Sequence, residues 1–536
     1  MEIRGIYLGL PLVIQKDGTI YFYKGMIEKD KEINISKYLK ETAIQIEYLD
    51  RIEVYKIEDF SIISFILNNQ DIDDFIKYLE NYSYNKIDNQ LVKHIRTIEN
   101  TMKIVSLELG KTEIIIRVLK GDFSFLETDR KLKGKIQKNN KEAFYTYPRE
   151  GNNKLIDYLA NKKVSMTLPN ENAKEEISIH FNKPYILRYY QEQALNILKN
   201  TNKGLIVMPV ASGKTYVATS LIEYLNKRTL IFCEGKDNCL NWKKFLLESL
   251  SISEEDISVC VDSSCDFKLG KINILSYDYV RKDQTNSRFE ELYNNIWGVI
   301  IYDDSHKVVT DKAVDLLYLK SEYKYAFAST LNRSDGKEES LLYLFGGIKY
   351  YVSSKELVNN LFLKKIECYR VDLRNNDISE YDFLKKISYK NKEKSLVIVA
   401  YYEKDIEEIS QILNINSLYN KTNIQNNNRL NLIEKFNNRK INRLCISVNF
   451  AEKYSVTNID IMISAGYRGG KGIEEEFKIG TLISTKEKLD KITTVQMFYL
   501  IDSDSDYSKV NKKEKIFKSY GFIFNKLDIN RYIGEN

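Results

Sequence analysis

Short apolar segments followed by amphipathic stretches recur from Tyr185 onward, and this alternation constrains the fold more than any other feature of the chain. The first series consists of GLIVM, TLIFC, INILS, WGVIIYDD and YKYAFAST. Continuous apolar runs separated by helical periods are typical of parallel strands covered on both faces. The pattern restarts at Lys394 with KSLVIVAYY and continues through RLCISV, IDIMISAG and VQMFYLID. The sequence therefore predicts two α/β units in tandem.

The segment before these units has a different texture. Short alternating strands such as TIYFYKGMI and TEIIIRVLK are mixed with a helical pattern near Ile72–Tyr82, which favours an α+β domain. All five prolines lie at or before Pro209, in keeping with a separate N-terminal architecture. We expect domains at residues 1–183, 184–355 and 356–536.

The composition is that of a folded protein, with 43% hydrophobic and 29% charged residues. No apolar run approaches the roughly 20 residues of a membrane helix, so we expect a cytoplasmic protein with no membrane partner. The net charge is only +6, so a nucleic-acid surface has to be local. The six cysteines lack the spacing of zinc ligands.

The segment PVASGKT lies between a predicted strand and a predicted helix, which is the context of a phosphate-binding loop. Backbone N–H groups at a helix N-terminus bind anionic phosphates. Lys214 is expected to contact the β- and γ-phosphates, and the Thr215 hydroxyl to bind Mg²⁺. The alternative is a chance GKT at a helix start, and Met208 stands where such loops usually begin with glycine. The predicted phosphate-binding residues are Ala211, Ser212, Gly213, Lys214 and Thr215.

The strand WGVIIY is followed directly by two carboxylates, Asp303 and Asp304. Ligands of α/β sheets bind at the carboxyl ends of the strands. We expect Asp303 to hold Mg²⁺ through water and Asp304 to orient or deprotonate the attacking water, while His306 couples the site to neighbouring segments. The alternative is a pair of solvated loop acids.

Upstream of the loop, ILRYYQEQALNILK predicts an amphipathic helix headed by Gln191. The amide of Gln191 is expected to contact an adenine edge through two hydrogen bonds, with support from Arg188.

The order of LRYYQEQAL, PVASGKT, LNWKKF, ILSYDYV, IIYDDSH and AFASTLNRSDG resembles that of superfamily 2 helicases. Within them it is similar to the branch that holds the XPB-type repair helicases and the phage recombination helicase UvsW. The resemblance covers about Tyr185 to Phe524. It implies an α/β protein with two RecA-like P-loop domains in tandem, preceded by the α+β domain, with ATP and Mg²⁺ bound between the two RecA-like domains. The implied activity is that of an ATP-dependent DNA helicase or translocase in repair, recombination or anti-phage defence.

The resemblance also assigns residues, since Met208 agrees with the residue type that this branch often has there. Trp242 matches a segment that lines the DNA track, and Ser276 matches a second segment that contacts the nucleic-acid backbone. Ser329 and Thr330 match the motif that couples hydrolysis to strand movement.

Departures from the family pattern concern the catalytic groups. Asp304 stands where the family has glutamate. The last motif aligns with FKIGTLIS, in which Gly480 survives as a cofactor contact and Lys478 keeps one charge, but Thr481 and Ser484 replace two arginines. Because an arginine finger is typically worth about 10³–10⁵ in rate, a second hypothesis is a weakened helicase-like subunit that binds ATP and DNA in a larger complex. A protein partner would then supply an arginine or a nuclease; substitutes within the chain are Arg468, Lys471 and Lys486.

A basic segment, DRKLKGKIQKNNK, lies in the N-terminal domain near several aromatic residues. Basic side chains beside aromatic rings can pair with phosphates and stack exposed bases. Lys131, Lys133 and Lys135 are therefore candidates for nucleic-acid contact. The alternative is a solvated loop between strands.

Overall fold

The structure, a computed structural model, describes residues 9–534 with gaps at 50, 68–69, 133, 140–143, 263–264, 266, 278, 280–286, 311–312, 331–337, 375–377, 420–425, 448–455, 467–471, 486–487 and 520–521. The chain forms two compact units. The first unit consists of Met1–Met208 and Gly213–Ser353, and the second of Ser354–Asn536 with the short segment Pro209–Ser212.

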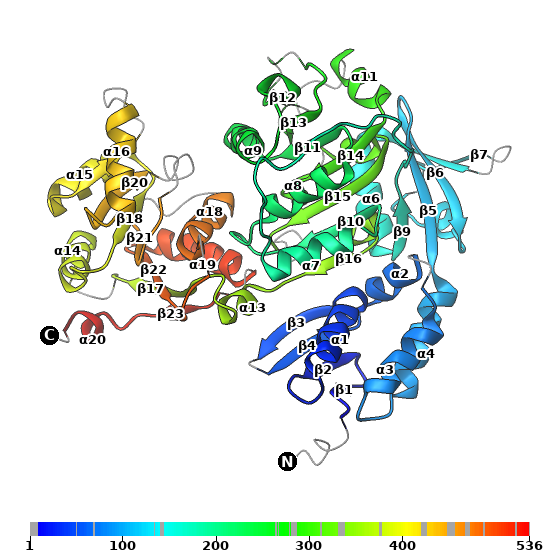
Figure 1. Cartoon of the computed structure of the whole chain (residues 1–536), viewed down its shortest axis with the longest axis horizontal. Coiled ribbons are helices and arrows are strands. Elements are labelled where there is room, and N and C mark those ends of the chain that lie inside the picture. The colour runs from blue at the N-terminus through cyan, green and yellow to red at the C-terminus, as the bar shows by residue number, and fades with distance from the viewer. Residues whose placement is uncertain are drawn as a thin grey trace. The chain divides into compact units, whose positions relative to one another are not determined.

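The first unit begins with an antiparallel sheet in the order β1-β2-β4-β3, accompanied by four helices within the described residues (Figure 1). Asp71 and Asp88 end the turns before α3 and α4, and their carboxylates accept hydrogen bonds from first-turn N–H groups, which fixes where each helix begins. The bounds are β1 (Leu12–Ile14), β2 (Thr19–Tyr23), α1 (Lys29–Thr42), β3 (Ile44–Leu49), β4 (Ile52–Lys56), α2 (Asp59–Leu67), α3 (Ile72–Tyr82) and α4 (Asn89–Thr101).

A second sheet follows, with the described strands in the order β7-β8-β6-β5-β9 and only the β5–β9 pair parallel among them. Buried polar contacts join it to the parallel sheet that comes next. The Asp315 carboxylate accepts hydrogen bonds from Arg149 Nε at 2.7 Å and from Asn152 Nδ2 at 2.8 Å. The bounds are β5 (Lys103–Leu109), β6 (Glu113–Lys120), α5 (Phe125–Thr128), β7 (Gln137–Asn139), β8 (Phe144–Pro148), α6 (Asn152–Asn161) and β9 (Val164–Thr167).

The first parallel sheet has, within the described residues, seven strands in the order β12-β13-β11-β14-β15-β10-β16. Every residue of β11, β13 and β14 is buried, as expected for strands covered on both faces. The bounds are α7 (Tyr189–Leu198), β10 (Lys203–Val207), α8 (Lys214–Leu225), β11 (Thr229–Cys233), α9 (Gly235–Ser249), β12 (Ile257–Cys260), β13 (Ile272–Ser276), α11 (Ser287–Asn294), β14 (Trp297–Tyr302), β15 (Ser321–Ala328), α12 (Glu338–Phe345) and β16 (Ile348–Tyr351).

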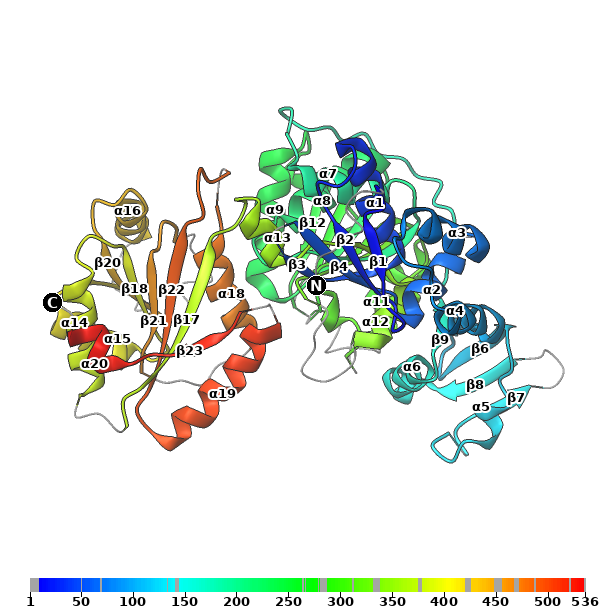
Figure 2. The same cartoon turned by 90° about the horizontal axis from the view of Figure 1, so that it is seen from below.

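The second unit holds a second parallel sheet, whose seven described strands run in the order β19-β20-β18-β21-β22-β17-β23. Figure 2 shows α14, α15 and α20 on one side of this sheet and α18 and α19 on the other. The bounds are α13 (Ser354–Asn359), β17 (Lys365–Asp372), α14 (Glu380–Lys390), β18 (Leu396–Ala400), α15 (Glu403–Leu413), β19 (Asn416–Leu418), α16 (Asn426–Asn437), β20 (Arg443–Ser447), β21 (Ile461–Ser464), α18 (Gly472–Ile483), β22 (Thr494–Ile501), α19 (Asp504–Ser519), β23 (Phe524–Lys526) and α20 (Ile529–Gly534).

The predicted fold class is confirmed, since an α+β region precedes two parallel α/β sheets. The predicted boundaries at residues 183 and 355 stay predictions. One continuous hydrophobic cluster contains Leu107 and Leu159 together with Leu205 and Val207, so the α+β region and the first parallel sheet share a core. Within the described residues, no helix has the length and apolar character needed to cross a bilayer.

Candidate active site

The phosphate-loop candidate connects the carboxyl end of β10 to the N-terminus of α8. Ala211 and Gly213 have left-handed backbone conformations, with φ of 61° and 82°. A side chain at position 213 would overlap the amide of Gln191, so glycine is required there for space as well as for backbone conformation. The Ser212 hydroxyl donates a hydrogen bond to the Pro209 carbonyl at 2.6 Å. The turn thus brings the chain to the start of α8, where backbone N–H groups can bind an anion.

Lys214 lies across this turn. Its Nζ donates hydrogen bonds to the Met208 carbonyl at 3.2 Å and to Ser329 Oγ at 2.9 Å. Ser329 follows β15, which pairs with β10 so that Val207 lies opposite Ala328. The lysine and the serine, 115 positions apart, therefore meet because two neighbouring strands end at the same edge of the sheet.

Asp303 is held by four hydrogen bonds just after β14. Its N–H donates to the Phe232 carbonyl at 2.8 Å, and its own carbonyl accepts the Tyr277 hydroxyl at 2.9 Å. The carboxylate accepts the Asp304 N–H at 3.1 Å through Oδ1 and the Trp242 indole N–H at 2.9 Å through Oδ2. Both carboxylate contacts come from neutral donors, so they orient the negative charge without neutralising it.

The other predicted acid–base residues lie in the same turn. Asp304 adopts a left-handed conformation, with φ of 50°, and His306 lies in the short 3-10 turn that follows. The neighbouring Lys307 is paired with Glu234 at 2.7 Å.

The groups around the two aspartates are protonated neutral side chains. A hydrogen bond from Cys239, burial, and the charges of Asp303 and Asp304 raise the pKa of the Cys233 thiol. Burial, followed by the same two aspartates, raises the pKa of the Tyr277 phenol. The two aspartates thus lie beside a buried thiol and a buried phenol that stay neutral, and carboxylate oxygens are ligands that a divalent cation such as Mg²⁺ prefers. Thr215, the other predicted metal ligand, lies in the first turn of α8.

Gln191 is 2% exposed, and its side chain accepts a backbone hydrogen bond at the start of α7. Its Oε1 accepts a hydrogen bond from the Arg188 N–H at 3.0 Å, and the Arg188 guanidinium donates to the Tyr190 hydroxyl at 3.3 Å. The amide thus fixes α7 beside Gly213. Its predicted contact with adenine stays a prediction, and the Oε1 half of the amide already has a partner.

Trp242 and Ser276, predicted to contact nucleic acid, are both buried. In this structure the indole N–H of Trp242 donates a hydrogen bond to the Asp303 carboxylate. Ser276 is the last residue of β13 and lies opposite Cys233 of β11. Both residues are buried as whole residues, and their contact with nucleic acid stays a prediction. Ser329 and Thr330 directly follow β15, and Ser329 contacts the phosphate-site lysine.

The N-terminal basic segment is only partly described. Lys131 and Lys135 are exposed, whereas Lys133 lies outside the described residues. Phe123 and Tyr147 on either side of it are buried in the core, so these rings cannot stack bases as placed. Phe125 and Phe144 beside the same segment are half-buried, and the contact of this segment with nucleic acid stays a prediction.

In the second unit, Gly480 lies within α18, whose one lysine is Lys478. Lys478 is 3% exposed and its Nζ lies 3.1 Å from the Glu475 carboxylate. Lys513 binds the same carboxylate at 2.6 Å, and Tyr499 donates its hydroxyl to it. Although burial alone would raise it, the two lysines lower the pKa of Glu475. Lys478 is therefore a buried, paired residue of the core. The three other candidate substitutes, Arg468, Lys471 and Lys486, lie outside the described residues.

A stacked pair of tyrosines near the loop was not predicted from the sequence. The ring of Tyr185 stacks on that of Tyr216, in the first turn of α8, with centroids 4.4 Å apart and an interplanar angle of 7°. Burial, and next the neighbouring Tyr216, raise the pKa of Tyr185 to about 12. The sequence signal was a tyrosine on each side of the predicted loop, but nothing in the spacing indicated that the rings meet.

Comparisons with known proteins agree with this geometry. Residues 184–333 match the family described as "Type III restriction enzyme, res subunit". The chain is 21% identical to the XPB subunit of general transcription and DNA repair factor IIH from Danio rerio, over 69% of this chain and 53% of that protein. It is 31% identical to the DNA 3'-5' translocase XPB2 of Sulfurisphaera tokodaii over 37% of this chain and 44% of that protein. The XPB subunit of Enterocytozoon bieneusi is 23% identical over 96% of this chain and 92% of that protein.

The chain thus spans about half the length of the Danio rerio and Sulfurisphaera tokodaii relatives. The family match falls on the stretch that carries the phosphate loop and the paired aspartates. The three relatives named above are XPB proteins. The chain is thus similar to XPB-type helicases and translocases of superfamily 2.

Proposed function

We propose that the chain is an ATP-dependent DNA translocase or helicase. The observation that carries this proposal is the convergence of Lys214, Ser329 and Asp303 at the carboxyl ends of β10, β15 and β14, beside the N-terminus of α8. A parallel sheet that gathers a lysine, a hydroxyl and a carboxylate at a helix start has the groups that nucleotide hydrolysis requires.

In this proposal the loop N–H groups and Lys214 hold the phosphates of ATP. Asp303 and Thr215 offer the hard oxygen ligands that Mg²⁺ prefers. The cation would neutralise charge that develops on the phosphates. Asp304 orients the attacking water, and its shorter side chain places its oxygens one methylene further back than glutamate would. His306, two residues on, is placed to couple this turn to neighbouring segments.

The substrate is proposed to be DNA, in line with the names of the XPB relatives. Contacts to phosphates, which carry no sequence information, would make binding independent of sequence. Repair, recombination or defence against phage are the settings in which such an activity would serve. We place it in the cytoplasm, where the six free cysteines would stay reduced.

The test is the ATPase rate of Lys214→Ala with and without DNA. Loss of the ammonium group should abolish DNA-stimulated hydrolysis, while Lys307→Ala, which removes a paired lysine of the neighbouring turn, should leave most of it. Wild-type hydrolysis that Lys214→Ala does not change would refute the site. A panel of duplex, forked and single-stranded DNA and RNA then identifies the nucleic acid.

A second function is favoured by the burial of Lys478, because this lysine was the one remaining cation in the motif that lacks its arginines. The chain would then bind ATP and DNA but hydrolyse slowly, until a partner protein supplies an arginine. Tight nucleotide binding with little turnover by the purified chain supports this function. Turnover at helicase rates by the chain alone rules it out.

A further inference from the structure

A hollow lies at the amino-terminal edge of the first parallel sheet, at the opposite ends of the strands from the phosphate loop. It has a volume of about 600 Å³, within the range of roughly 300–1,000 Å³ typical of small-molecule sites. Residues of α1, α2, the connection from α7 to β10, β15 and β16 form its wall. We call it the lysine groove, after Lys37, Lys199 and Lys349.

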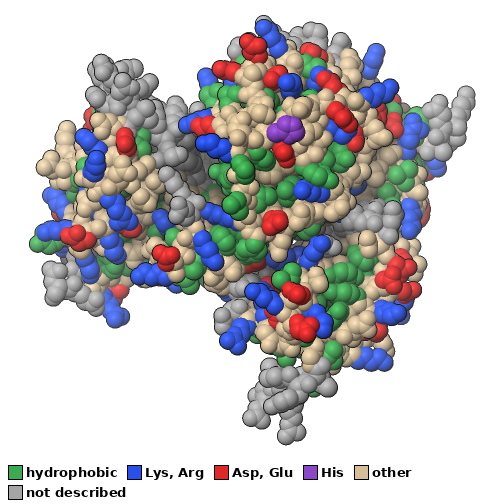
Figure 3. Space-filling model, in the orientation of Figure 1, with side chains coloured by type: hydrophobic (Ala, Val, Ile, Leu, Met, Phe, Trp, Pro, Cys, Tyr) green, Lys and Arg blue, Asp and Glu red, His purple; other side chains and the backbone are tan. Residues whose placement is uncertain are grey.

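The charge of this lining has one sign. Three lysines line the groove and, among its described lining residues, there is no aspartate or glutamate. Acidic and basic side chains are interspersed over the face drawn in Figure 3, so a lining without carboxylates is a local property. Lys349 is buried, and its methylenes pack against Gly204. A side chain at position 204 would overlap these methylenes.

A smaller hollow adjoins the lysine groove and shares Asn202 with it. Lys203 and Lys324 line it and lie opposite each other on β10 and β15. Lys324 is buried and donates hydrogen bonds to the carbonyls of Pro169 at 2.8 Å and Leu317 at 3.1 Å. Burial lowers the pKa of both lysines, that of Lys324 to about 7 with a further contribution from Lys203.

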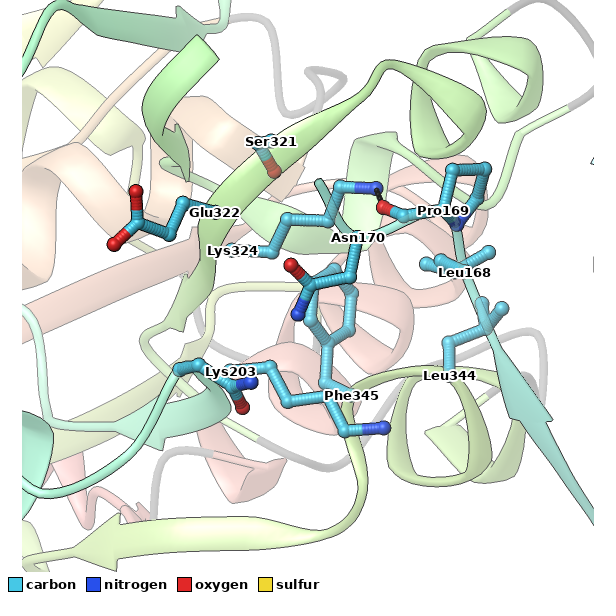
Figure 4. Close-up of a pocket in the computed structure, with 10 residues that line it drawn as sticks. Leu168, Pro169, Asn170, Lys203, Ser321, Glu322, Lys324, Leu344 and Phe345 are labelled. Atoms are coloured by element: carbon cyan, nitrogen blue, oxygen red, sulfur yellow. Dashed lines mark hydrogen bonds between the residues drawn. The ribbon is translucent and has the colours of Figure 1, made fainter. Parts of the chain in front are cut away.

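Glu322 also lines the smaller hollow. Figure 4 shows that its carboxylate points away from the Lys324 ammonium group. Glu322 is paired with Lys227 at 3.0 Å instead. Ser321 Oγ is buried and has no hydrogen-bond partner. Lys324 has its two carbonyl acceptors, so the Ser321 hydroxyl is the buried polar group of this lining that is costly to leave without a partner.

Flat surfaces complete the lysine groove. Tyr38 and Tyr323 are part of its wall and are half-buried. Tyr38 is held by a stacked contact with Tyr78, with ring centroids 3.7 Å apart. Residues with side-chain amides, among them Asn200 and Asn202, also line the groove. Lysines suit phosphates, tyrosine faces suit bases, and amides suit base edges.

We propose that the lysine groove binds a nucleotide unit, with its phosphates on the lysines and its base against a tyrosine ring. The unit is either a free nucleotide or one nucleotide of a single strand, because both present the same chemistry. The site is separate from the phosphate loop, since β10 begins at Lys203 on this edge and ends at Val207 on the other. It goes beyond the proposed ATPase, which does not use this edge.

The test measures binding of two probes to the full chain that carries Lys214→Ala, so that the phosphate loop does not dominate. The probes are fluorescent methylanthraniloyl-ADP and a fluorescein-labelled oligothymidylate of 20 nucleotides. Lys37→Glu combined with Lys199→Glu should weaken at least one probe 10-fold or more. The matched control, Lys154→Glu combined with Lys174→Glu, makes the same charge change at exposed lysines elsewhere on the first unit and should leave both affinities unchanged.

The pattern of loss identifies the source of the nucleotide. Weaker binding of the ADP probe indicates a free nucleotide, whereas an effect on the oligothymidylate alone indicates a strand. For a strand, losing two phosphate contacts should also reduce the slope of log K against log[salt] by about 1.4. If both probes bind the groove variant as tightly as the control variant, the proposal is wrong.

The base contact is tested separately with Tyr323→Leu, which keeps an apolar side chain but removes the ring. Binding should fall about 5- to 100-fold if a base stacks there, and unchanged binding overturns the assignment of the base. Because Lys199 lies over the Tyr224 ring at 4.4 Å, Lys199→Gln replaces Lys199→Glu if thermal unfolding shows that the latter disturbs the fold. Failure of the proposed ATPase would show in Lys214→Ala alone, with no bearing on the groove variants.

Discussion

Replacing Trp242 by phenylalanine should raise the Mg²⁺ requirement of the ATPase without abolishing nucleotide binding. The indole N–H donates to Asp303 Oδ2 at 2.9 Å, and phenylalanine fills most of the same buried space but donates nothing. The carboxylate would then keep only the Asp304 N–H to orient it. Rotation of the carboxylate moves the oxygen that the proposed cation needs.

The magnitude follows from two independent estimates. A hydrogen bond from a neutral donor to a charged acceptor contributes about 1.5–3 kcal/mol. Loss of a group that orients a metal ligand typically lowers metal affinity or activity about 10- to 100-fold, which corresponds to about 1.4–2.7 kcal/mol. Both place the expected shift of the half-saturating Mg²⁺ concentration at one to two decades.

The assay is DNA-stimulated ATP hydrolysis as a function of Mg²⁺, together with nucleotide binding in EDTA. The chain provides its own control because it has two tryptophans. Trp297 is buried at the start of β14, and its indole N–H donates to the Leu292 carbonyl at 3.0 Å. Trp297→Phe removes the same indole N–H from the same unit and should lower thermal stability comparably while leaving the Mg²⁺ dependence unchanged.

Equal Mg²⁺ dependence in the two variants would refute the orienting role of Trp242. A third result discriminates between roles: if Trp242→Phe lowers the affinity for DNA while the Mg²⁺ dependence stays at the wild-type value, the side chain acts on nucleic acid as its sequence context predicted.

Two further predictions concern stability. Asp315→Ala should destabilise the first unit by about 1–3 kcal/mol in urea unfolding, since it removes the acceptor of the buried Asn152 amide and of the partly exposed Arg149 guanidinium; Glu171→Ala, which breaks an exposed pair, should cost less than about 1 kcal/mol. Burial lowers the pKa of Lys324 from its ordinary value of 10.5 to about 7. Between these two pH values the unfolded chain binds more protons than the folded one. The free energy of unfolding should therefore rise with pH across this window, by at most about 1.4 kcal/mol per pH unit. Lys324→Met should flatten that rise, and an equal slope in both proteins would contradict the burial argument.

The strands and the place of the site followed from the sequence because both depend on local pattern. Apolar runs such as TLIFC and WGVIIY can only be buried on both faces, and they form β11 and β14. In a parallel sheet every strand points the same way, so a loop after β10 and a carboxylate after β14 must lie at one edge. No knowledge of side-chain contacts was needed for that step.

The roles of single side chains did not follow, since they depend on contacts between distant segments. Trp242 and Asp303 are 61 positions apart, and the direction of an indole N–H is set by packing. Lys478 counted as a retained charge in its motif, but Glu475, Tyr499 and Lys513 enclose it. A charged residue type in a motif thus predicts availability only when the residue is also exposed.

Position 208 shows the same distinction between side chain and backbone. The glycine that such loops usually have was missing, yet Met208 takes part through its backbone: its N–H donates to the Ala328 carbonyl at 3.0 Å and its carbonyl accepts Lys214. Its side chain is fully buried and lies outside the turn that approaches phosphate. The left-handed conformations fall instead at Ala211 and Gly213, and only the second also lacks room for a Cβ. This loop therefore tolerates methionine at position 208, where the chain continues from the strand. It tolerates alanine at position 211, at a cost of about 1–2 kcal/mol for a left-handed residue. It requires glycine only at position 213.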